Sequence, residues 1–482
     1  MAFTSMAITG VALTEREKGA HLLRRFGLGA SEAELDYYLQ DGLKGAIERL
    51  LNYDTQPEVV EISTEMLRNK NGNLPIQTVA GWWAAKMLIT RRPLQEKMTL
   101  FWHNHFATSG DKVVNSTMMI AQNEKLRAFA TSKFKTLLLE VSRDPAMLVW
   151  LDGQDNIKGR ANENFARELF ELFTLGVGHY EEKDIQEAAR AFTGWSFVRG
   201  KGSRYARAEY LFKPALHDSG LKTVLGKSGN LTGEDVIDHV CSLPRTAEFI
   251  VQKLWNWFVY PHPQPATLKP FIDGFIKSDL DIKVLLRQIM TSEEFYSERS
   301  IRMVVKNPVD FCLTTLRAMG IGETIAQGLA SVPPMDDEDA RQTALRSKIG
   351  TAVACGQAMK NQGMWLLFPP DVSGWKPGEA WITSATMVER INWANRILGT
   401  TGRGTLGRYP IFNLLSADTT PMGIAQKLCS IYDAPIKGRK LVLLAEAAEK
   451  AMAGEPLTQK NAPLVASTVT KLIFGTPEYQ FA

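Results

Sequence analysis

Apolar residues recur with a period close to 3.6 along most of the chain, the spacing that places them on one face of a helix. The stretch EREKGAHLLRRFGLGA predicts a helix that ends at Gly27 or Gly29, because glycine commonly closes helices in the left-handed conformation. SEAELDYYLQDG follows, with Ser31 as N-cap and Glu34 three positions later, the spacing of a capping box. The same period predicts further helices over 42–53, 75–91, 94–106, 112–131, 162–176, 182–193, 233–242, 246–260, 280–291, 303–318, 337–360, 384–398, 421–432, 438–453 and 463–474.

One region departs from the helical period. WSFVRGKGSRYARAEYLFKP alternates polar and apolar residues, is rich in aromatic residues, and carries Gly200 and Gly202 near its middle, which predicts a hairpin. KTVLG at 222–226 is a candidate for one more short strand. The predicted fold is therefore mainly α, a multi-helix globular bundle with a small antiparallel β insertion near 195–226.

The domain organisation follows from these elements and from the length of 482 residues. We expect a flexible lead-in over 1–12, a main helical domain with the β insertion over 13–396, and a C-terminal helical segment over 397–482 packed on the main domain. No run of 18 apolar residues occurs, so no membrane-spanning helix is expected. The first residues lack the basic and apolar regions of a secretory signal, which favours the cytoplasm.

Composition excludes some classes of function. The 56 basic and 52 acidic residues give a net charge of +4, and no dense basic stripe occurs, so nucleic acid is not an expected partner. The four cysteines are far apart in the sequence, which predicts buried thiols and leaves a disulfide between distant ones open. There is no GxGxxG, P-loop, GxSxG or HExxH motif, so nucleotide-driven, serine-hydrolase and zincin chemistry are not expected.

The stretch RPLQEKMTLFWHNHF places two of the seven histidines at the end of a predicted helix. At 100° per residue His105 shares an apolar face with Met98 and Trp102, whereas His103 lies with Glu96 on a different face. We therefore expect His105 to be buried and to donate to a backbone carbonyl or a carboxylate, and His103 to lie outside the core. His103 is a candidate acid–base group or metal ligand, although a helix-end side chain explains it equally well.

The stretch NENFARELFELFTLG carries Glu163, Arg167 and Glu171 four positions apart, with Glu168 at the margin of this polar stripe. One interpretation is a solvated helix face held by Glu–Arg pairs. The other is a cleft in which Arg167 keeps one carboxylate ionised while a second has a raised pKa, so that one site holds both an acid and a base.

Two loops carry further candidates. His217 and Asp218 open a loop after the predicted hairpin, where they would suit proton transfer, metal binding or a local turn. Trp375 and Trp381 lie in the loop PPDVSGWKPGEAWI, where they would pack on the core or form an aromatic platform for a sugar. Gly374 and Gly378 of that loop would allow a close approach of the backbone.

Several stretches together resemble the bacterial domain-of-unknown-function family 1800, over almost the whole chain. They are HLLRRFGLGAS (21–31), LQEKMTLFWHNHFATS (94–109), NENFARELFELFTLGVGHYEEKDIQEAARAFTGW (162–195), HDSGLKTVLG (217–226), LFPPDVSGWKPGEAWI (367–382) and the closing TPEYQ. The resemblance implies no established activity. It implies a family whose members are often exported, which would favour the periplasm, and whose genes often neighbour a sulfatase-like family.

Two hypotheses of function follow. The first is an acid–base or metal-assisted hydrolase or lyase acting on a glycan-like or other polymeric substrate. Its catalytic candidates are His103, Glu163, Arg167, Glu168, His217 and Asp218, and its substrate-binding candidates are Trp375 and Trp381. In the metal-assisted version, a divalent metal would be held by His103, Glu168, His217 and Asp218. The second hypothesis is a non-enzymatic helical scaffold or binding partner of a neighbouring sulfatase-like protein. Convergence of the catalytic candidates on one pocket would favour the enzyme.

Overall fold

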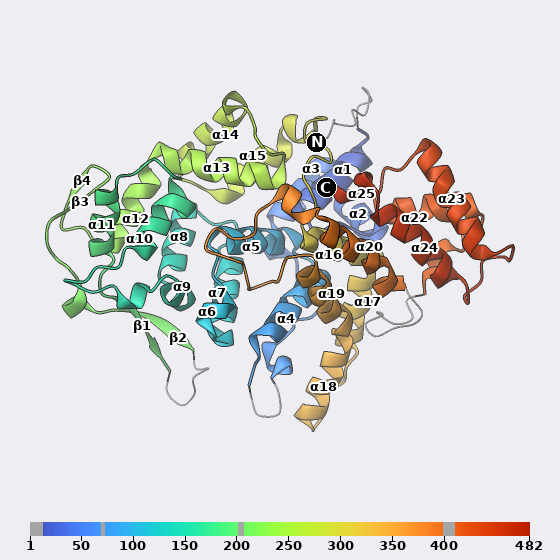
Figure 1. Ribbon diagram of the computed structural model, residues 1–482, viewed down its shortest axis with the longest axis horizontal. Coiled ribbons are helices and arrows are strands. Elements are labelled where there is room, and N and C mark those ends of the chain that lie inside the picture. Colours follow the sequence, from blue (N-terminus) through green and yellow to red (C-terminus); the bar gives the residue numbers. More distant parts are fainter. Residues whose placement is uncertain (1–12, 69–72, 201–206, 399–409) are drawn as a thin grey trace.

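The computed structural model describes residues 13–68, 73–200, 207–398 and 410–482, so the predicted lead-in over 1–12 lies outside the described residues. The described chain is mainly helical, as predicted (Figure 1). The first group of helices is α1 (Glu15–Phe26), α2 (Glu32–Leu39), α3 (Gly42–Leu51), α4 (Ile76–Ile89), α5 (Pro93–His105), α6 (Gly110–Val113), α7 (Ser116–Ala128), α8 (Phe134–Ser142) and α9 (Pro145–Trp150).

The middle of the chain contains half of the remaining helices and one π-helical segment. These are α10 (Asn164–Glu168), the π-helical segment (Leu169–Thr174), α11 (Glu182–Ala191), α12 (Gly233–Ser242), α13 (Pro244–Phe258), α14 (Pro265–Lys277), α15 (Ile282–Thr291), α16 (Pro308–Ala318) and α17 (Ile321–Ala330). The last group is α18 (Glu338–Lys348), α19 (Gly350–Asn361), α20 (Ser384–Leu398), α21 (Ile411–Leu415), α22 (Pro421–Ile431), α23 (Gly438–Met452), α24 (Ala462–Phe474) and α25 (Pro477–Gln480). Short 3₁₀ turns occur at Tyr53–Thr55, Thr64–Leu67, Gly153–Asp155, Pro214–Leu216, Glu294–Tyr296 and Gly378–Trp381.

Local signals fixed the helix ends where the sequence predicted them. Helix α1 ends at Gly27, although the backbone of this glycine is extended (φ −107°) and not left-handed as expected, and α2 begins with a capping box. The Glu34 N–H donates to Ser31 Oγ at 3.2 Å, and the Ser31 N–H donates to Glu34 Oε2 at 3.0 Å. These bonds satisfy two N–H groups that the helix start would otherwise leave unpaired.

The β insertion also forms as predicted. Strand β1 (Trp195–Arg199) pairs antiparallel with β2 (Ala208–Phe212), and residues 201–206 of the connection lie outside the described residues. The stretch at 222–226 contributes β3 (Lys222–Val224), which pairs with β4 (Lys227–Gly229) as a second two-stranded sheet. The β insertion therefore extends slightly past residue 226.

Six helices, α8, α9, α14, α17, α21 and α25, escaped the sequence prediction, and three predicted helices are interrupted. The one predicted over 112–131 breaks at Val114 and Asn115, between α6 and α7. The one predicted over 162–176 changes to a π-helical segment at Leu169, and the one over 337–360 is divided at Ile349. Helix α14 contains Pro270, which removes a helix hydrogen bond. Buried Phe271 and Phe275 hold this helix against the core, so tertiary packing outweighs the local signal.

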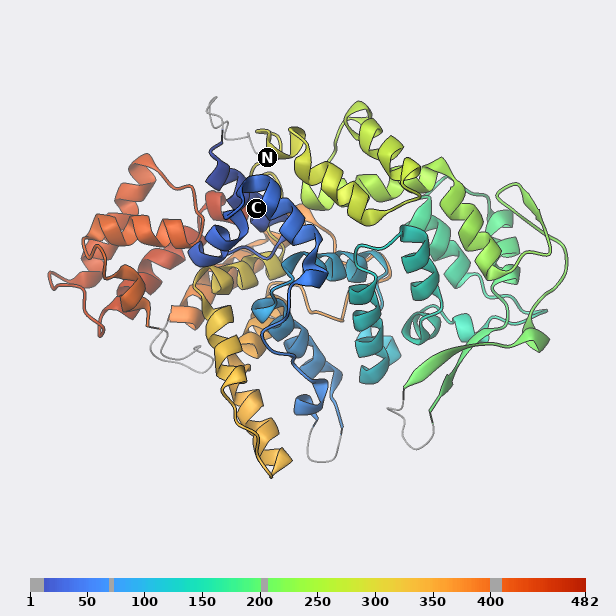
Figure 2. The ribbon, with the colours of Figure 1, turned by 180° about the vertical axis from the view of Figure 1, so that it is seen from behind.

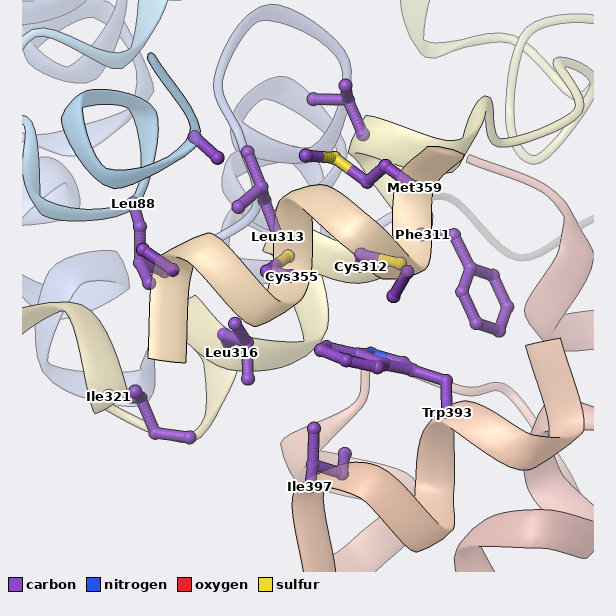
Figure 3. Close-up of a cluster of buried hydrophobic side chains, with 14 of the residues drawn as sticks. Leu88, Phe311, Cys312, Leu313, Leu316, Ile321, Cys355, Met359, Trp393 and Ile397 are labelled. Carbon is purple, nitrogen blue, oxygen red and sulfur yellow. The ribbon is translucent and has the colours of Figure 1, made fainter. Parts of the chain in front are cut away.

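Two apolar cores organise the molecule. The first joins α4, α16, α17, α19 and α20 to the C-terminal helices α22–α24, and the second joins α1, α3 and α8 to α10–α15. Figure 3 shows part of the first core, where Leu88, Leu316, Met359 and Trp393 meet from four helices. Helix α5 contributes Leu100 to the first core and Trp102 to the second, so nearly all of its residues are buried.

The four cysteines are free and buried, which confirms the predicted thiols. Cys312 Sγ accepts a hydrogen bond from Gln362 Nε2 at 3.1 Å within the first core. Among the described residues, no helix combines the length and the apolar character needed to cross a membrane.

Candidate functional site

His103 lies in the core, so the expectation that it would lie outside the core is wrong. Its side chain is 1% exposed because Trp83 of α4 and Trp375 of the loop after α19 cover it. The ring centroids lie 5.3 Å and 5.7 Å from that of His103. Burial lowers the pKa of His103 to about 3, so the imidazole is neutral at physiological pH. Its Nε2 is buried and has no hydrogen-bond partner among the described residues.

The loop over 367–382 docks directly on this end of α5. The Trp375 N–H donates to Asn104 Oδ1 at 2.7 Å. Gly374 has φ +81°, and a Cβ added there would lie 2.4 Å from the Asn104 carbonyl oxygen. The close approach that this glycine permits is therefore to α5. Trp375 and Trp381 are both buried, so neither ring offers an open face to a sugar in this structure.

His105 is buried, as predicted, and it supports the π-helical segment. Its Nε2 hydrogen-bonds the Phe173 carbonyl at 3.1 Å, and Lys253 Nζ lies 3.1 Å from its Nδ1. Lys253 Nζ also donates to the Leu172 carbonyl at 3.3 Å. A π-helix changes the hydrogen-bond ladder of its turn, and these two basic side chains satisfy the carbonyls at its end. Burial lowers the pKa of Lys253 to about 8.

Arg167 pairs with Glu163, as the spacing of four predicted. Arg167 NH2 lies 3.1 Å from Glu163 Oε2 and 2.8 Å from Glu182 Oε2 of α11. The Arg167 and Glu163 side chains are 34% and 38% exposed, so these pairs lie on a solvated face. Exposed pairs of this kind contribute about 0.2–1 kcal/mol.

Glu168 and Glu171 have a different environment, where α10 passes into the π-helical segment. Glu168 is half-buried, and its pKa is raised by burial and by the nearby Glu171 carboxylate. Glu171 accepts a hydrogen bond from Tyr180 Oη at 2.8 Å. Two neighbouring carboxyl groups therefore differ in their surroundings. Arg167, which the second interpretation placed with the carboxylates in a cleft, instead pairs with Glu163 and Glu182 on a solvated face.

His217 and Asp218 form a local turn that is tied to α11. His217 Nδ1 lies 2.9 Å from the Thr193 carbonyl, and Asp218 Oδ1 accepts the Gly220 N–H at 2.8 Å. Arg190 Nε donates to Asp218 Oδ2 at 2.8 Å. The Arg190 hydrogen bond and then the Gly220 N–H lower the pKa of Asp218 to about 2.

The structure thus separates the predicted site residues into two groups. Glu163, Arg167 and Glu168 lie near the start of α11, and His217 and Asp218 lie near its end, about 12 Å along the helix by the rise per residue. In both views this region occupies one end of the molecule, whereas α5 with His103 lies near the middle (Figures 1 and 2). No three His, Cys, Asp or Glu side chains in the described ranges could hold one metal ion. The predicted ligand set of His103, Glu168, His217 and Asp218 is therefore not assembled.

An open cleft of about 550 Å³ lies between the turn before α11 and the β3–β4 sheet. Its lining includes His179, Tyr180, Lys183, Asp184 and Thr223. Tyr180 lines the cleft and also donates to Glu171, so one side chain links the cleft to the carboxyl pair. One interpretation of the sequence placed a cleft in this region, but its lining includes none of Glu163, Arg167, Glu168 and Glu171.

A second cavity, of about 340 Å³, lies between α2, the end of α4 and α17. Its lining includes Glu34, Tyr38, Leu88, Arg317 and Glu323. The only sequence signal near it is the capping box of Glu34. Arg317 and Glu323 are almost 300 positions away in the sequence, and α17 was not predicted, so no local pattern indicated this pocket.

Comparison with known proteins adds a family but no activity. The family described as "Protein of unknown function (DUF1800)" matches the chain over residues 21–481. No curated protein and no solved structure matches the chain. The matched range covers nearly the whole chain, and it includes both groups of site residues and both cavities. The chain therefore belongs to the domain-of-unknown-function family 1800.

Proposed function

We propose that the chain is an acid–base enzyme, a hydrolase or lyase acting on a glycan-like or other polymeric substrate, with Glu168 and Glu171 as its acid–base pair. The environment of Glu168 carries the proposal. Its carboxyl group is half-buried, makes no ion pair within the described part of the chain, and has a raised pKa. A carboxyl group that keeps its proton to a higher pH is suited to protonate a leaving group.

Glu171 supplies the second carboxyl group of the pair. Its carboxyl group accepts a hydrogen bond from Tyr180 Oη at 2.8 Å, which fixes its orientation beside Glu168. The Glu171 charge raises the pKa of Glu168, so the two carboxyl groups lie near each other. Glycosidases commonly use two carboxyl groups that flank the scissile bond, one as the acid and the other as base or nucleophile. The presence of this pair therefore supports acid–base cleavage of a glycosidic bond.

The cleft beside Tyr180 supports a polymeric, hydroxyl-rich substrate. It is open and lined largely by polar side chains, including His179, Lys183 and Asp184. A polymer has to enter and leave a site at both ends, and a hydroxyl-rich chain needs hydrogen-bonding partners along the cleft. In this proposal Arg167 and Asp218 are positioning residues, because each ties a flanking segment to α11.

The π-helical segment supports the same location. Single π-helical turns are rare and frequently occur at functional sites. This one begins directly after Glu168 and contains Glu171. His105 and Lys253 bond to carbonyls of its last turn, so the core braces the segment that carries the pair.

The test is turnover of polysaccharides by the full chain. A panel of neutral and acidic polysaccharides is incubated between pH 4 and pH 8, and new reducing ends and unsaturated products are measured. Glu168→Gln should lower the rate at least 100-fold, in line with the about 10²–10⁴ that a general acid contributes. Glu163→Gln is the matched control, since Glu163 lies on the same stretch in an exposed ion pair, and it should retain most of the rate. No turnover by the unaltered protein, or equal rates for the two variants, would contradict the proposal.

A second candidate is the non-enzymatic scaffold or binding partner of a sulfatase-like protein. The observation that favours it is the structural use of several catalytic candidates: His103 is packed between two tryptophans, and His217 and Asp218 form a turn bonded to α11. Titration of the purified sulfatase-like neighbour into this protein by calorimetry tests it. Saturable binding without any turnover of the panel would favour the scaffold over the enzyme.

A further inference from the structure

The end of strand β2 and the 3₁₀ turn that follows it expose a run of apolar side chains. Residues 211–216, LFKPAL, are all exposed, and five of these six residues are apolar. Leu211, Phe212 and Leu216 are 40%, 38% and 36% exposed. Runs of about three or four consecutive exposed apolar residues, such as Pro214–Leu216, are normally avoided unless they serve a function.

The pairing of the hairpin places Leu211 on its outer face. Leu211 pairs with Ser196, and Glu209 pairs with Val198, so these four residues lie on one face of the β1–β2 ribbon. The opposite face carries Trp195, which is buried in the second core. Val198 is 51% exposed, and both views place the hairpin at the edge of the molecule (Figures 1 and 2). The ribbon therefore presents Val198 and Leu211 to solvent.

Three basic side chains flank the apolar run. Lys213 lies within it, and the Lys158 N–H donates to the Leu216 carbonyl at 2.8 Å. That bond holds the turn of residues 157–160 beside the run, and Arg160 closes the turn by a bridge to Ile157. Lys158, Arg160 and Lys213 are exposed, and none of them forms an ion pair with a described residue. Residues 211–216 together with Lys158 and Arg160 are called the hairpin base below.

The charge of the surrounding surface is also positive. Arg199 and Arg207 are two more exposed basic residues at the ends of the strands. The exposed acidic residues are Asp155 and Glu209, and Glu209 faces Arg207 at 3.9 Å. Over residues 155–160, 195–200 and 207–216, five basic residues therefore stand against two acidic ones. The surface suits a partner that is negatively charged and offers apolar contacts.

We propose that the hairpin base docks on the surface of an anionic lipid bilayer. Its apolar run enters the boundary between headgroups and acyl chains, where leucine and phenylalanine side chains are favourable. The three flanking basic side chains lie against the anionic headgroups, which attract lysine and arginine near the surface. The two attractions act together, since binding of this kind depends on buried apolar area and on charge.

The same charges argue against a second copy of the chain as the occupant. In a two-fold contact each patch meets an identical patch, so the basic side chains of one copy would face those of the other. A stable protein partner commonly covers about 800 Å² on each side, from about 20–30 residues. The hairpin base has eight residues. A bilayer sets no such minimum, because it surrounds whatever segment enters it.

Flotation of the full chain with lipid vesicles tests the proposal. One set of vesicles contains phosphatidylcholine alone, and the other contains two parts of phosphatidylcholine to one part of phosphatidylglycerol. The partition coefficient should be at least about tenfold higher for the anionic vesicles. The difference should shrink as salt is added, because salt screens exposed charges. The measurement requires no turnover, so its result is independent of the polysaccharide test.

The double replacement Lys158→Gln with Lys213→Gln tests the electrostatic part. Each basic side chain near an anionic surface contributes about fivefold to binding, so the partition coefficient should fall about 25-fold. Lys44→Gln with Lys460→Gln is the matched control. Both of these lysines are exposed, form no ion pair with a described residue, and lie away from the hairpin, on α3 and before α24 (Figure 1). The control should bind anionic vesicles within about twofold of the unaltered protein.

The replacement Leu211→Ser tests the apolar part. It should lower the partition coefficient at least about threefold, because the shorter polar side chain gains less on leaving water. Val442→Ser is its control, since Val442 is 45% exposed on α23, far from the hairpin in both views (Figures 1 and 2). All the replaced side chains are exposed, so the melting temperatures should stay close to that of the unaltered protein.

Four outcomes would overturn the proposal: no flotation, equal flotation with the two kinds of vesicle, flotation that survives the loss of Lys158 and Lys213, or no effect of Leu211→Ser. The last of these, together with binding of the chain to dextran sulfate, would assign the surface to a soluble polyanion. A dimer in solution that Leu211→Ser dissociates, without flotation, would assign it to a second copy.

Discussion

Helix α5 and helix α11 carry similar polar side chains, but the structure gives them opposite surroundings. On α5, Glu96, Lys97 and His103 are all buried, the first two in ion pairs and the third in its neutral form. On α11, Glu182 and Arg190 pair with partners at or near the solvent. The comparison teaches that residue types alone do not separate a structural polar group from a functional one, since the same chemistry serves the core in one helix and the surface in the other.

The two helices should therefore respond very differently to mutation. A buried charge that loses its partner is not rehydrated by water. Removal of one partner of a buried ion pair therefore strongly lowers the free energy of unfolding. An exposed charge exchanges its partner for water at little cost. Substitutions in and around the two helices test this contrast.

The largest effect should come from Glu96 on α5. Its carboxylate accepts hydrogen bonds from Arg127 and, at 2.9 Å, from Trp83 Nε1. Glu96→Ala should lower the free energy of unfolding by about 3–5 kcal/mol, the cost of breaking a buried pair. Because Glu124 still pairs with Arg127, the lower end of that range is expected. Urea denaturation followed by circular dichroism measures it, and a loss below about 1 kcal/mol would remove the contrast between the two helices.

The next effect should come from the loop that covers α5. Gly374 and Gly378 both have φ near +80°, but only at Gly374 would a Cβ meet backbone, 2.4 Å from the Asn104 carbonyl oxygen. Left-handed backbone costs an alanine about 1–2 kcal/mol, and the steric overlap adds about 1–3 kcal/mol. Gly374→Ala should therefore cost about 2–5 kcal/mol and Gly378→Ala only about 1–2 kcal/mol. Equal melting temperatures for the two variants would contradict a close contact between Gly374 and the backbone of α5.

A smaller effect should appear in the pH dependence of stability. The pKa of His103 is about 3 in the folded protein, below its ordinary value of 6.5, so the unfolded chain binds the proton first as the pH falls. Stability due to His103 is full above pH 6.5 and declines below it, by about 1.3 kcal/mol between pH 7 and pH 5.5.

The replacement His103→Phe removes this titration, so its free energy of unfolding should fall less steeply over that interval. His21 and His105, whose pKa values burial also lowers, contribute equally in both proteins. If the free energy of unfolding falls equally steeply with pH in the two proteins, His103 is reached by solvent in the folded state.

The smallest effect should come from Arg167, which belongs to the exposed region near α11. Its partners Glu163 and Glu182 are themselves solvated. Arg167→Ala should change the free energy of unfolding by about 0.5 kcal/mol, as for other exposed pairs. A loss above about 2 kcal/mol would show that Arg167 is buried among carboxylates. The ion pairs near α11 would then be buried like those of α5.

Much of the fold could be predicted because its signals are local. The capping box of Ser31 and Glu34, the end of α1 at Gly27 and the pairing of Arg167 with Glu163 each involve residues within four positions. The hairpin of β1 and β2 was equally visible, because strand alternation and turn residues occur together in one short stretch. Interactions of this range are set by backbone geometry and do not depend on the rest of the chain.

Less of the candidate site could be predicted, because its determinants are not local. The half-buried state of Glu168, the π-helical turn after it and the cleft beside Tyr180 arise where α10, α11 and β3 pack together. The pocket of Glu34 and Glu323 needs α17, whose helical signal the sequence did not reveal.

Patterns in the sequence were enough to predict the helical class, most helix positions, the β insertion and the burial of the cysteines. The absence of disulfides and the burial of particular polar side chains depend on how distant segments pack together. The periodicity of α5 predicted one apolar face, and yet both His103 and His105 are buried, because the two cores and the loop over 367–382 enclose the helix on every side. Trp375 reaches α5 from 271 positions away, and burial depends on such distant contacts, which no local pattern encodes.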